Sequence, residues 1–386
     1  YPTFAAMRRE APLQRQAGLD GTTPIWFVTR YADVDAMLRD KRFVRDVRLA
    51  LDPERLPPPT PLDALLEGHM LNRDGADHRR LRGLVSQAFT PSRVAALRPR
   101  IETIANELLD AALDRGRMDL VKEFSYPLPT IVILEMLGVP AADRERFRDW
   151  SNALIAPPTS SEAGAAAVAH LTAFTDYLRA LFAERRAAPR DDLLTGLVHA
   201  AQGGDRLSEE ELFATVVLLI VAGHETTVNL IANAVLAMSR TPEVRDRLRA
   251  EPKGIPRAVE EFLRFDGSVE RAINRFAAED VEWNGHLIRR GEPVILILAS
   301  ANHDDALFAD PDRLDVDRHP NPHLGFGKGH HYCLGAPLAR LETEVALDAL
   351  LARLPGLHLD VPEEELRWRF LPGFRALEAL PVAWEV

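Results

Sequence analysis

The feature that most constrains this chain is a helical pattern from Ser208 to about Ser239, whose middle is apolar on every side. The pattern opens with Ser208-Glu209-Glu210-Glu211, in which the Ser208 hydroxyl can cap the N–H of Glu211 while that glutamate reaches back. Residues Thr215–Ala222 then present no polar face, and a helix that is apolar all round is buried. We therefore expect one long helix to cross the interior, with the remaining chain packed around it.

The rest of the chain predicts a mainly α fold with a small β component. Hydrophobic periodicity predicts further helices, at Ser92–Leu113, Ala165–Arg185 and Ile255–Phe265. Strand patterns are few, and they comprise Pro24–Val28 and a hairpin of Val281–Leu287 and Glu292–Leu298 that turns at Arg289-Arg290-Gly291. Proline-rich Leu56–Pro61 and the stretch Ile155–Gly164 are expected to be loops. Because no repeat and no linker marks a boundary, we expect residues 1–386 to form a single domain.

Composition excludes several classes of function. The chain has 386 residues and a formal net charge of −11, which argues against general binding of nucleic acid. Its longest uninterrupted apolar run, Val216–Ala222, is too short to span a membrane, and no secretory signal is visible. A single cysteine cannot form an internal disulfide, so a reducing compartment, the cytoplasm, is expected.

That cysteine, Cys333, lies in a glycine-rich segment just before a predicted helix, Leu334–Glu342. At a helix N-terminus the free N–H groups and the helix dipole favour a thiolate. The preceding glycines permit tight turns and let another group approach closely. A lone cysteine is also commonly a small buried apolar residue, and several histidines nearby leave a zinc site open. A thiolate nucleophile with His331 or His330 as base is a further alternative.

The long helix carries a second unusual block, Ala222-Gly223-His224-Glu225-Thr226-Thr227. An unpaired carboxylate is expensive to bury, and a glycine inside a helix costs about 1 kcal/mol relative to alanine. A threonine hydroxyl can bond a carbonyl one turn back and bend the helix. Such local costs, clustered in an apolar segment, indicate a functional site rather than a solvated helix end.

The cysteine segment, Phe326-Gly327-Lys328-Gly329-His330-His331-Tyr332-Cys333-Leu334-Gly335, resembles the haem-binding signature of the cytochrome P-450 superfamily, Phe-Gly-x-Gly-x-His-x-Cys-x-Gly. The likeness is to the soluble bacterial type. It implies a cytochrome P-450 fold in which haem b is buried between the long central helix and the cysteine loop. By the same resemblance Cys333 is the ligand of the iron, Phe326 packs near the sulfur and His331 reaches a haem propionate. Gly327 and Gly335 are fixed positions of that signature.

Four further segments resemble motifs of the same superfamily. Ala222–Thr226 matches the block beside the haem, so that Ala222 and Gly223 adjoin the cofactor while Glu225 and Thr226 deliver protons to dioxygen. The segment Glu261-Phe262-Leu263-Arg264 matches a structural Glu-x-x-Arg motif, for which Arg318 is the expected third member and Arg313 the runner-up. The remaining matches are three cations expected to hold haem propionates, His78, Arg82 and Arg275.

The resemblance implies a monooxygenase that inserts one atom of O2 into a hydrophobic organic substrate. Electrons are expected from NAD(P)H through separate proteins, a ferredoxin or flavodoxin and a reductase, because one cysteine cannot hold an iron–sulfur cluster. Surface candidates for that contact are Arg79, Arg80 and Lys328. The alternatives are a peroxide-driven peroxygenase, which usually lacks the acid–alcohol pair, and a non-catalytic haem-thiolate sensor.

Family geometry also implies where the substrate lies, and Arg271 is a possible anchor for an anionic group. The expected pocket segments are Leu56–Leu71, Ile155–Phe174, Leu218–Ala222, Val269–Ile273 and Leu371–Phe374.

Overall fold

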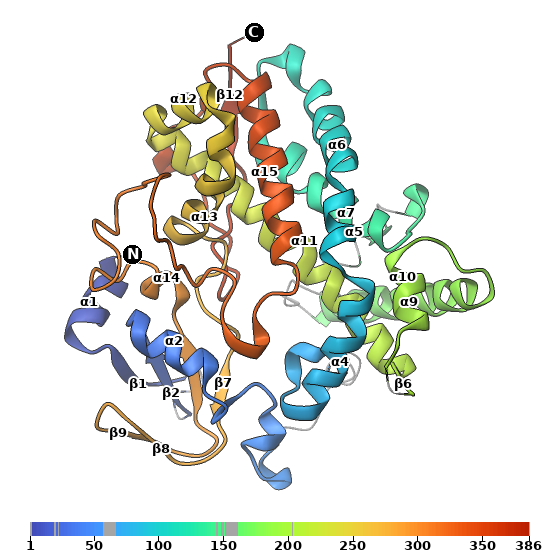
Figure 1. The fold of residues 1–386 in the computed structure, drawn as a ribbon, viewed down its shortest axis with the longest axis vertical. Coiled ribbons are helices and arrows are strands. Elements are labelled where there is room, and N and C mark those ends of the chain that lie inside the picture. The colour runs from blue at the N-terminus through green and yellow to red at the C-terminus, as the bar shows by residue number, and fades with distance from the viewer. Residues whose placement is uncertain are drawn as a thin grey trace. The chain divides into compact units, whose positions relative to one another are not determined.

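The computed structural model describes residues 2–18, 21, 23–56, 67–143, 146, 147, 150, 161–202 and 204–385. Its contacts divide the chain into two compact units. The first unit comprises Tyr1–Pro57, Arg98–Tyr126 and Thr226–Val386, and the second comprises Pro58–Leu97 and Pro127–Glu225. Helices dominate both units, and short strands form the minor part (Figure 1), which confirms the mainly α prediction. The expectation of a single domain stays a prediction.

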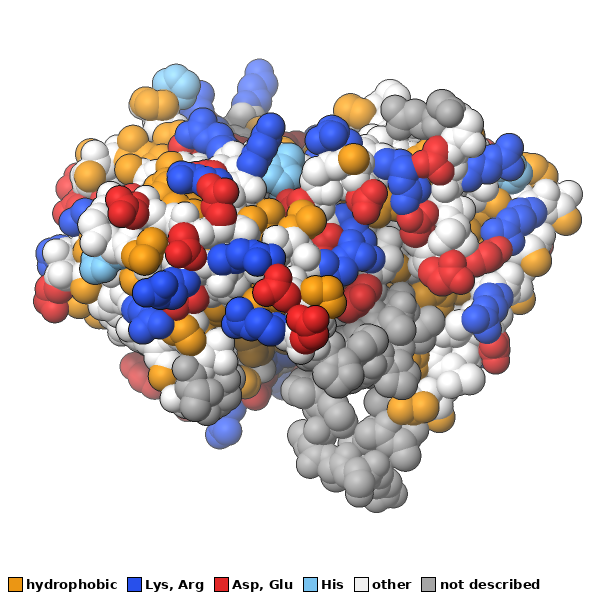
Figure 2. Space-filling view, turned by 90° about the horizontal axis from the view of Figure 1, so that it is seen from below, with side chains coloured by type: hydrophobic (Ala, Val, Ile, Leu, Met, Phe, Trp, Pro, Cys, Tyr) orange, Lys and Arg blue, Asp and Glu red, His pale blue; other side chains and the backbone are white. Residues whose placement is uncertain are grey.

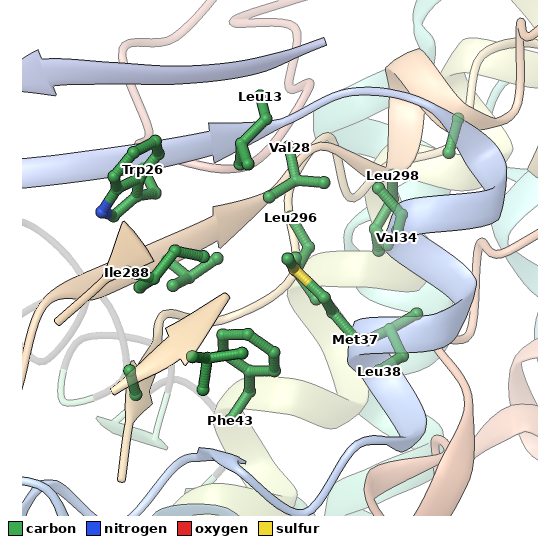
Figure 3. Packing of buried hydrophobic residues seen from close by; sticks show 14 of the residues in the cluster. Leu13, Trp26, Val28, Val34, Met37, Leu38, Phe43, Ile288, Leu296 and Leu298 are labelled. Carbon is green, nitrogen blue, oxygen red and sulfur yellow. The ribbon is translucent and has the colours of Figure 1, made fainter. Parts of the chain in front are cut away.

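The first unit contains a five-stranded sheet in the order β1-β2-β10-β7-β3. Its strands are β1 (Leu13–Ala17), β2 (Pro24–Val28), β10 (Pro293–Leu296), β7 (Arg275–Ala277) and β3 (Phe43–Val44). Strand β10 pairs in parallel with β2 and antiparallel with β7. Helix α2 (Tyr31–Arg39) packs its apolar side chains against this sheet, as Figure 3 shows for Val34, Met37 and Leu38. This cluster is one buried core of the unit.

The predicted hairpin at Arg289-Arg290-Gly291 is wrong. The hairpin is instead formed by β8 (Val281–Trp283) and β9 (His286–Ile288), and β10 leaves it to join the five-stranded sheet. The turn lies at Asn284-Gly285, where both residues have positive φ, 47° and 77°. An Asn-Gly pair tolerates the left-handed conformations that a two-residue hairpin turn requires, and it is the stronger hairpin signal.

Helices pack together in the rest of the first unit. They are α1 (Pro2–Glu10), α6 (Arg98–Asp110), α12 (Pro242–Ala250), α13 (Ile255–Phe265), α14 (Leu298–Ala301) and α15 (Ala336–Arg353). Helix α15 contacts α6, α12 and α13, and it lies beside α6 in Figure 1. A three-stranded sheet of β11 (His358–Leu359), β12 (Pro381–Ala383) and β4 (Arg117–Asp119) completes the unit.

The second unit is built from helices around α10 (Leu193–His199), which contacts α4 (Gly75–Ala88) and α9 (Ser161–Ala187). Its other elements are α5 (Pro91–Ala96), α7 (Pro127–Met136), β5 (Ala201–Gln202) and β6 (Asp205–Arg206). Arg185 is fully buried on α9, where its guanidinium binds Asp192 at 2.5 Å and donates to the carbonyl of Gly138 at 2.7 Å. These bonds satisfy a charge that would otherwise be costly to bury.

Helix α11 (Glu209–Arg240) confirms the prediction of one long buried helix. The Glu211 N–H donates to Ser208 Oγ at 3.2 Å, and the Ser208 N–H donates to Glu211 Oε2 at 2.9 Å, so the capping box is formed. By length and composition α11 is apolar enough to cross a membrane. However, 67% of its most apolar window is buried within the protein, as in the core helix of a globular domain.

The helix predicted at Ser92–Leu113 is interrupted. Helix α5 ends at Ala96 and α6 begins at Arg98, with Pro99 in its first turn. A proline lacks the N–H that would continue the hydrogen-bond ladder, and its ring clashes with the carbonyl four residues earlier. Of the loop predicted at Leu56–Pro61, all but Leu56 lies outside the described residues. Of the second predicted loop, Ile155–Ser160 lies outside them, and Ser161–Gly164 begins helix α9, so the loop prediction is wrong for those four residues. Described charges of both signs are interleaved over the face shown in Figure 2.

Candidate functional site

The Cys333 loop lies at the N-terminal end of α15, as the sequence predicts. The backbone N–H of Cys333 donates to the carbonyl of Phe326 at 3.0 Å, which closes the loop on itself. Helix α15 begins at Ala336 with Pro337 in its first turn, and Cys333 is half-buried. The helix dipole therefore favours the thiolate form of a thiol that is still accessible.

The backbone conformation of the Cys333 loop depends on two glycines. Gly327 and Gly329 have φ angles of +66° and +74°, in the left-handed region that other residues rarely adopt. A Cβ atom on Gly329 would lie 2.7 Å from the carbonyl oxygen of Leu38, so the backbone of α2 packs directly against the loop. Any larger residue at position 329 would displace the loop from α2.

The acid–alcohol block lies on α11, where Glu225 and Thr226 follow one another. His224 and Glu225 are 1% and 4% exposed, whereas Ala222 is exposed on a helix whose neighbouring residues are mostly buried. His224 Nδ1 lies 2.7 Å from the carbonyl of Ile220, and its Nε2 lies 3.9 Å from Glu225 Oε2, beyond hydrogen-bond distance. Helix α11 therefore carries a buried carboxyl group, that of Glu225, and an exposed small residue, Ala222, three positions earlier.

The Glu-x-x-Arg motif forms a buried ion-pair network. Arg264 binds Glu261 through both nitrogens of its planar fork, at 2.8 and 2.7 Å. Arg318 Nε lies 3.2 Å from both oxygens of Glu261, which confirms it as the third member. Arg313 contributes its carbonyl, which accepts from Arg264 at 3.2 Å. Asn321, which the sequence did not indicate, donates to Glu261 at 3.1 Å.

The three expected propionate cations lie on separate elements. His78 and Arg82 are one turn apart on α4, and the His78 ring nitrogen Nδ1 lies 2.9 Å from the carbonyl of Met70. Arg275 begins β7, is 2% exposed, and donates to the carbonyl of Phe43 at 3.0 Å. The His78 ring and the Arg275 guanidinium are buried and Arg82 is half-buried, but the role of all three toward a propionate stays a prediction.

Two of the expected surface cations are already paired. Arg80 forms ion pairs with Glu211 and Asp205, and Lys328 Nζ lies 2.9 Å from Asp35 Oδ1. Arg79 is exposed. Of the three, Arg79 is therefore the cation whose charge is least compensated by the described residues.

Two of the expected pocket segments adjoin one another. The Glu270 N–H donates to the carbonyl of Gly373 at 2.9 Å, and Val269 bridges to Phe374. Arg271 packs its side chain against Gly373, since a Cβ atom there would lie 3.0 Å from Arg271 Nε. Much of Leu56–Leu71, and part of Ile155–Phe174, lies outside the described residues.

The residues present fit a bound haem. Cys333 offers a soft thiolate donor, which suits iron, at the end of a helix whose dipole supports its charge. A small residue, Ala222, is the one exposed residue of α11 between Glu211 and Ser239. The buried guanidinium of Arg275 has the planar geometry that carboxylates prefer.

Comparison with known proteins gives the family. A model of the cytochrome P-450 family matches residues 20–365. Cytochrome P-450 107B1 of Saccharopolyspora erythraea is 46% identical over 386 residues, which cover 98% of this chain and 93% of that protein. Polyketide biosynthesis cytochrome P-450 PksS of Bacillus subtilis is 41% identical, over 99% of this chain and 95% of the relative.

Solved structures agree with that assignment. The solved structure of PksS superposes on this chain with a TM-score of 0.93, and the match covers 100% of this chain and 96% of the PksS chain. A structure of P-450 BioI in complex with an acyl carrier protein bearing hexadec-9Z-enoic acid has a TM-score of 0.90 and 38% identity, over 100% of this chain and 97% of that one. The chain belongs to the cytochrome P-450 family. It has the fold of that family, whose relatives are named monooxygenases and hydroxylases and whose cofactor is a haem iron.

Proposed function

We propose that this protein is a haem b monooxygenase that inserts one atom of O2 into a hydrophobic organic substrate. The observation that carries the proposal is the setting of Cys333, the only cysteine of the chain. Its backbone is fixed by the Phe326 carbonyl and its side chain lies at the N-terminal end of α15. A thiolate so placed is what the ligand of an oxygen-activating haem requires.

Cys333 would hold the iron, and His78, Arg82, Arg275 and His331 would hold the propionates. A thiolate-ligated haem iron supplies the binding of dioxygen and favours cleavage of its O–O bond. Within this proposal Gly327, Gly335 and Phe326 shape the loop beside the sulfur, and Ala222 and Gly223 adjoin the cofactor on α11. A Cβ atom on Gly223 would lie 3.2 Å from the Ile133 side chain, so this glycine also lets α7 pack close to α11.

Glu225 and Thr226 are the residues proposed to move protons. The reaction consumes two protons for each atom of oxygen released as water, and these must enter a site from which bulk solvent is excluded. A carboxylate can accept and release a proton, and an adjacent hydroxyl can hold the hydrogen bond that orients it. The burial of Glu225 in a mostly apolar stretch of α11 supports this role, because it places a carboxyl group in the protein interior.

The proposed substrate class is an apolar organic molecule, including an acyl chain or a polyketide. Support comes from the mostly apolar segments Val269–Ile273 and Leu371–Phe374, which adjoin one another, and from the names of the relatives. We infer that Arg271, which packs on Gly373 beside these segments, is the anchor for an anionic group on such a substrate.

The electron donors are proposed to be a separate ferredoxin or flavodoxin and an NAD(P)H reductase in the cytoplasm. This chain offers one thiol, too few to hold an iron–sulfur cluster of its own. Arg79 is the preferred surface cation for an acidic donor, since Arg80 and Lys328 already form ion pairs. No nucleic acid or membrane partner is proposed.

The proposal is tested by the spectrum of the purified, reduced protein under carbon monoxide. A thiolate-ligated haem gives a strongly red-shifted Soret band, which Cys333→Ser is expected to lose. A colourless wild-type protein, or a variant that keeps the band, contradicts the assignment of Cys333. Turnover with a surrogate ferredoxin and reductase then separates an enzyme from a haem sensor.

Thr226→Ala tests the proton path. The variant is expected to consume NAD(P)H at a comparable rate but to divert electrons to hydrogen peroxide or water instead of product. Unchanged coupling between NAD(P)H consumption and product would contradict this role. Product formation from hydrogen peroxide alone, at a rate similar to that with the redox partners, would favour the peroxygenase alternative.

A further inference from the structure

A second charge cluster, separate from the Glu-x-x-Arg network, lies beside the Cys333 loop. Arg340 on α15 binds both oxygens of Glu260 on α13, through Nε at 2.6 Å and Nη2 at 2.9 Å. His323, at the start of the loop, places its Nε2 3.0 Å from the same carboxylate. Two helices and the loop are therefore joined by one carboxylate.

The guanidinium of Arg340 also touches the two aromatic side chains of the loop. Its central carbon lies 4.5 Å from the centroid of the Phe326 ring, in cation–π geometry. Its Nη1 donates to the Tyr332 hydroxyl at 3.3 Å, and the rings of Tyr332 and Phe326 meet edge to face at 6.2 Å. Phe326 and Tyr332 adjoin Cys333, the first through a hydrogen bond and the second along the chain.

We propose that Arg340, held in place by Glu260, is a positioning residue for Cys333 that fixes the Phe326 ring and tunes the electron-donating strength of the thiolate. The inference rests on the proposed function, because it takes Cys333 as the ligand of haem. The proposed link from Arg340 to Cys333 consists of two contacts. The Arg340 guanidinium packs on the Phe326 ring, and the Phe326 carbonyl accepts a hydrogen bond from the Cys333 N–H at 3.0 Å.

The Glu260 carboxylate and the Arg340 guanidinium both stay charged under ordinary conditions. Burial favours the neutral form of Glu260, but hydrogen bonds from Arg340 and His323 lower the pKa of this carboxyl to about 2. The rigid fork of arginine suits both tasks, since it can bind a carboxylate along one edge and lie over a ring with its face. A lysine supplies the charge without that geometry.

The sign of the expected effect follows from electrostatics. One-electron reduction of a haem adds negative charge, which a nearby cation stabilises and a nearby anion opposes. Arg340→Met removes the cation and leaves the Glu260 carboxylate without its main partner. Both changes disfavour the reduced form. We expect the equilibrium constant for reduction to fall about tenfold, a shift of about 59 mV toward negative potential.

The experiment is a spectroelectrochemical titration of the haem-loaded protein, together with the carbon monoxide spectrum. The variants are Arg340→Met, Arg340→Lys and Glu260→Gln. We expect Arg340→Met to shift the potential most, and Arg340→Lys to restore part of the shift because it keeps the charge. The matched control is Arg353→Met, which removes an arginine from the same helix whose carboxylate partner is Asp110 on α6. The control should leave both readouts unchanged.

A double variant tests the path through the ring. If Arg340 acts by holding Phe326, then Arg340→Met in a Phe326→Leu background should shift the potential less than in the wild type. Folded variants with the potential and band of the wild type would overturn the inference while leaving the proposed function standing. If Arg340→Met fails to fold, the comparison of Arg340→Lys with wild type decides. A wild-type protein without the red-shifted band refutes the proposed function first.

Discussion

Acid is expected to destabilise this protein through one buried histidine, His303. The side chain is 3% exposed in the turn after α14, and its Nδ1 lies 3.0 Å from the carbonyl of Ala299. Burial, with a contribution from the nearby guanidinium of Arg264, lowers the pKa of His303 to about 4. The native protein therefore keeps this imidazole neutral at pH values where the unfolded chain binds a proton.

The size and sign of the effect follow from linkage. An unfolded pKa of about 6.5 and a native pKa of about 4 differ by about 3 kcal/mol in proton binding. Because the unfolded chain takes up the proton first, stability is highest above pH 6.5 and falls as the pH is lowered toward 4. Between pH 7 and pH 5 the expected loss from His303 is about 2 kcal/mol.

The loss is measured by urea unfolding at pH 7, 6 and 5, which gives the free energy of unfolding of the wild type and of each variant at each pH. His303→Gln keeps a neutral polar group and should lose about 2 kcal/mol less than the wild type over that range, since the other titrating groups are common to both. His286→Gln, at an exposed position in β9, is the matched control and should follow the wild type. Equal pH dependence of His303→Gln and the wild type would refute the reasoning.

Three further variants probe separate features of the fold. Ser208→Ala removes the side-chain cap of α11 and should cost about 1 kcal/mol in the free energy of unfolding, whereas Ser208→Thr should recover most of it; no change would refute the capping role. Glu261→Ala leaves Arg264 buried without its carboxylate and should cost about 3 kcal/mol or more, seen as loss of soluble protein or a lower Tm; a variant as stable as the wild type contradicts this. Burial raises the pKa of Glu342 well above its usual range, so stability from this group is present at low pH and lost as the pH rises. Glu342→Gln should therefore gain stability relative to the wild type at pH 9 more than at pH 5, and a constant difference across that range would count against it.

Sequence patterns correctly predicted the elements whose formation depends mainly on neighbouring residues. Ile255–Phe265 and Pro24–Val28 form a helix and a strand with the expected bounds, because apolar spacing and Pro256 in the first turn suffice to define them. The capping box at Ser208 likewise needs only four consecutive residues. Where a local rule was overlooked the prediction failed, as at Asn284-Gly285, whose turn geometry outcompetes the Arg289–Gly291 segment.

Contacts between distant parts of the chain were predicted only where a family motif named both partners. Arg318 was expected to meet Glu261 for that reason, and it does. The stacking of Arg340 on Phe326 and its pairing with Glu260 across 80 residues carry no periodic or compositional signal. Such pairings depend on how the helices pack against one another. A short stretch of a single sequence carries no signal for that packing.

The parallel pairing of β2 with β10 has a consequence during protein synthesis. Trp26 and Val294 are register partners, although about 270 residues separate them. At a translation rate of about 5–20 residues per second, β2 emerges from the ribosome roughly 15 to 50 seconds before its partner strand exists. During that interval its apolar residues have β1 and α2 beside them but lack β10, β7 and the rest of the core. The yield of folded protein in a cell should therefore depend on chaperones that shield this N-terminal segment until the last third of the chain arrives.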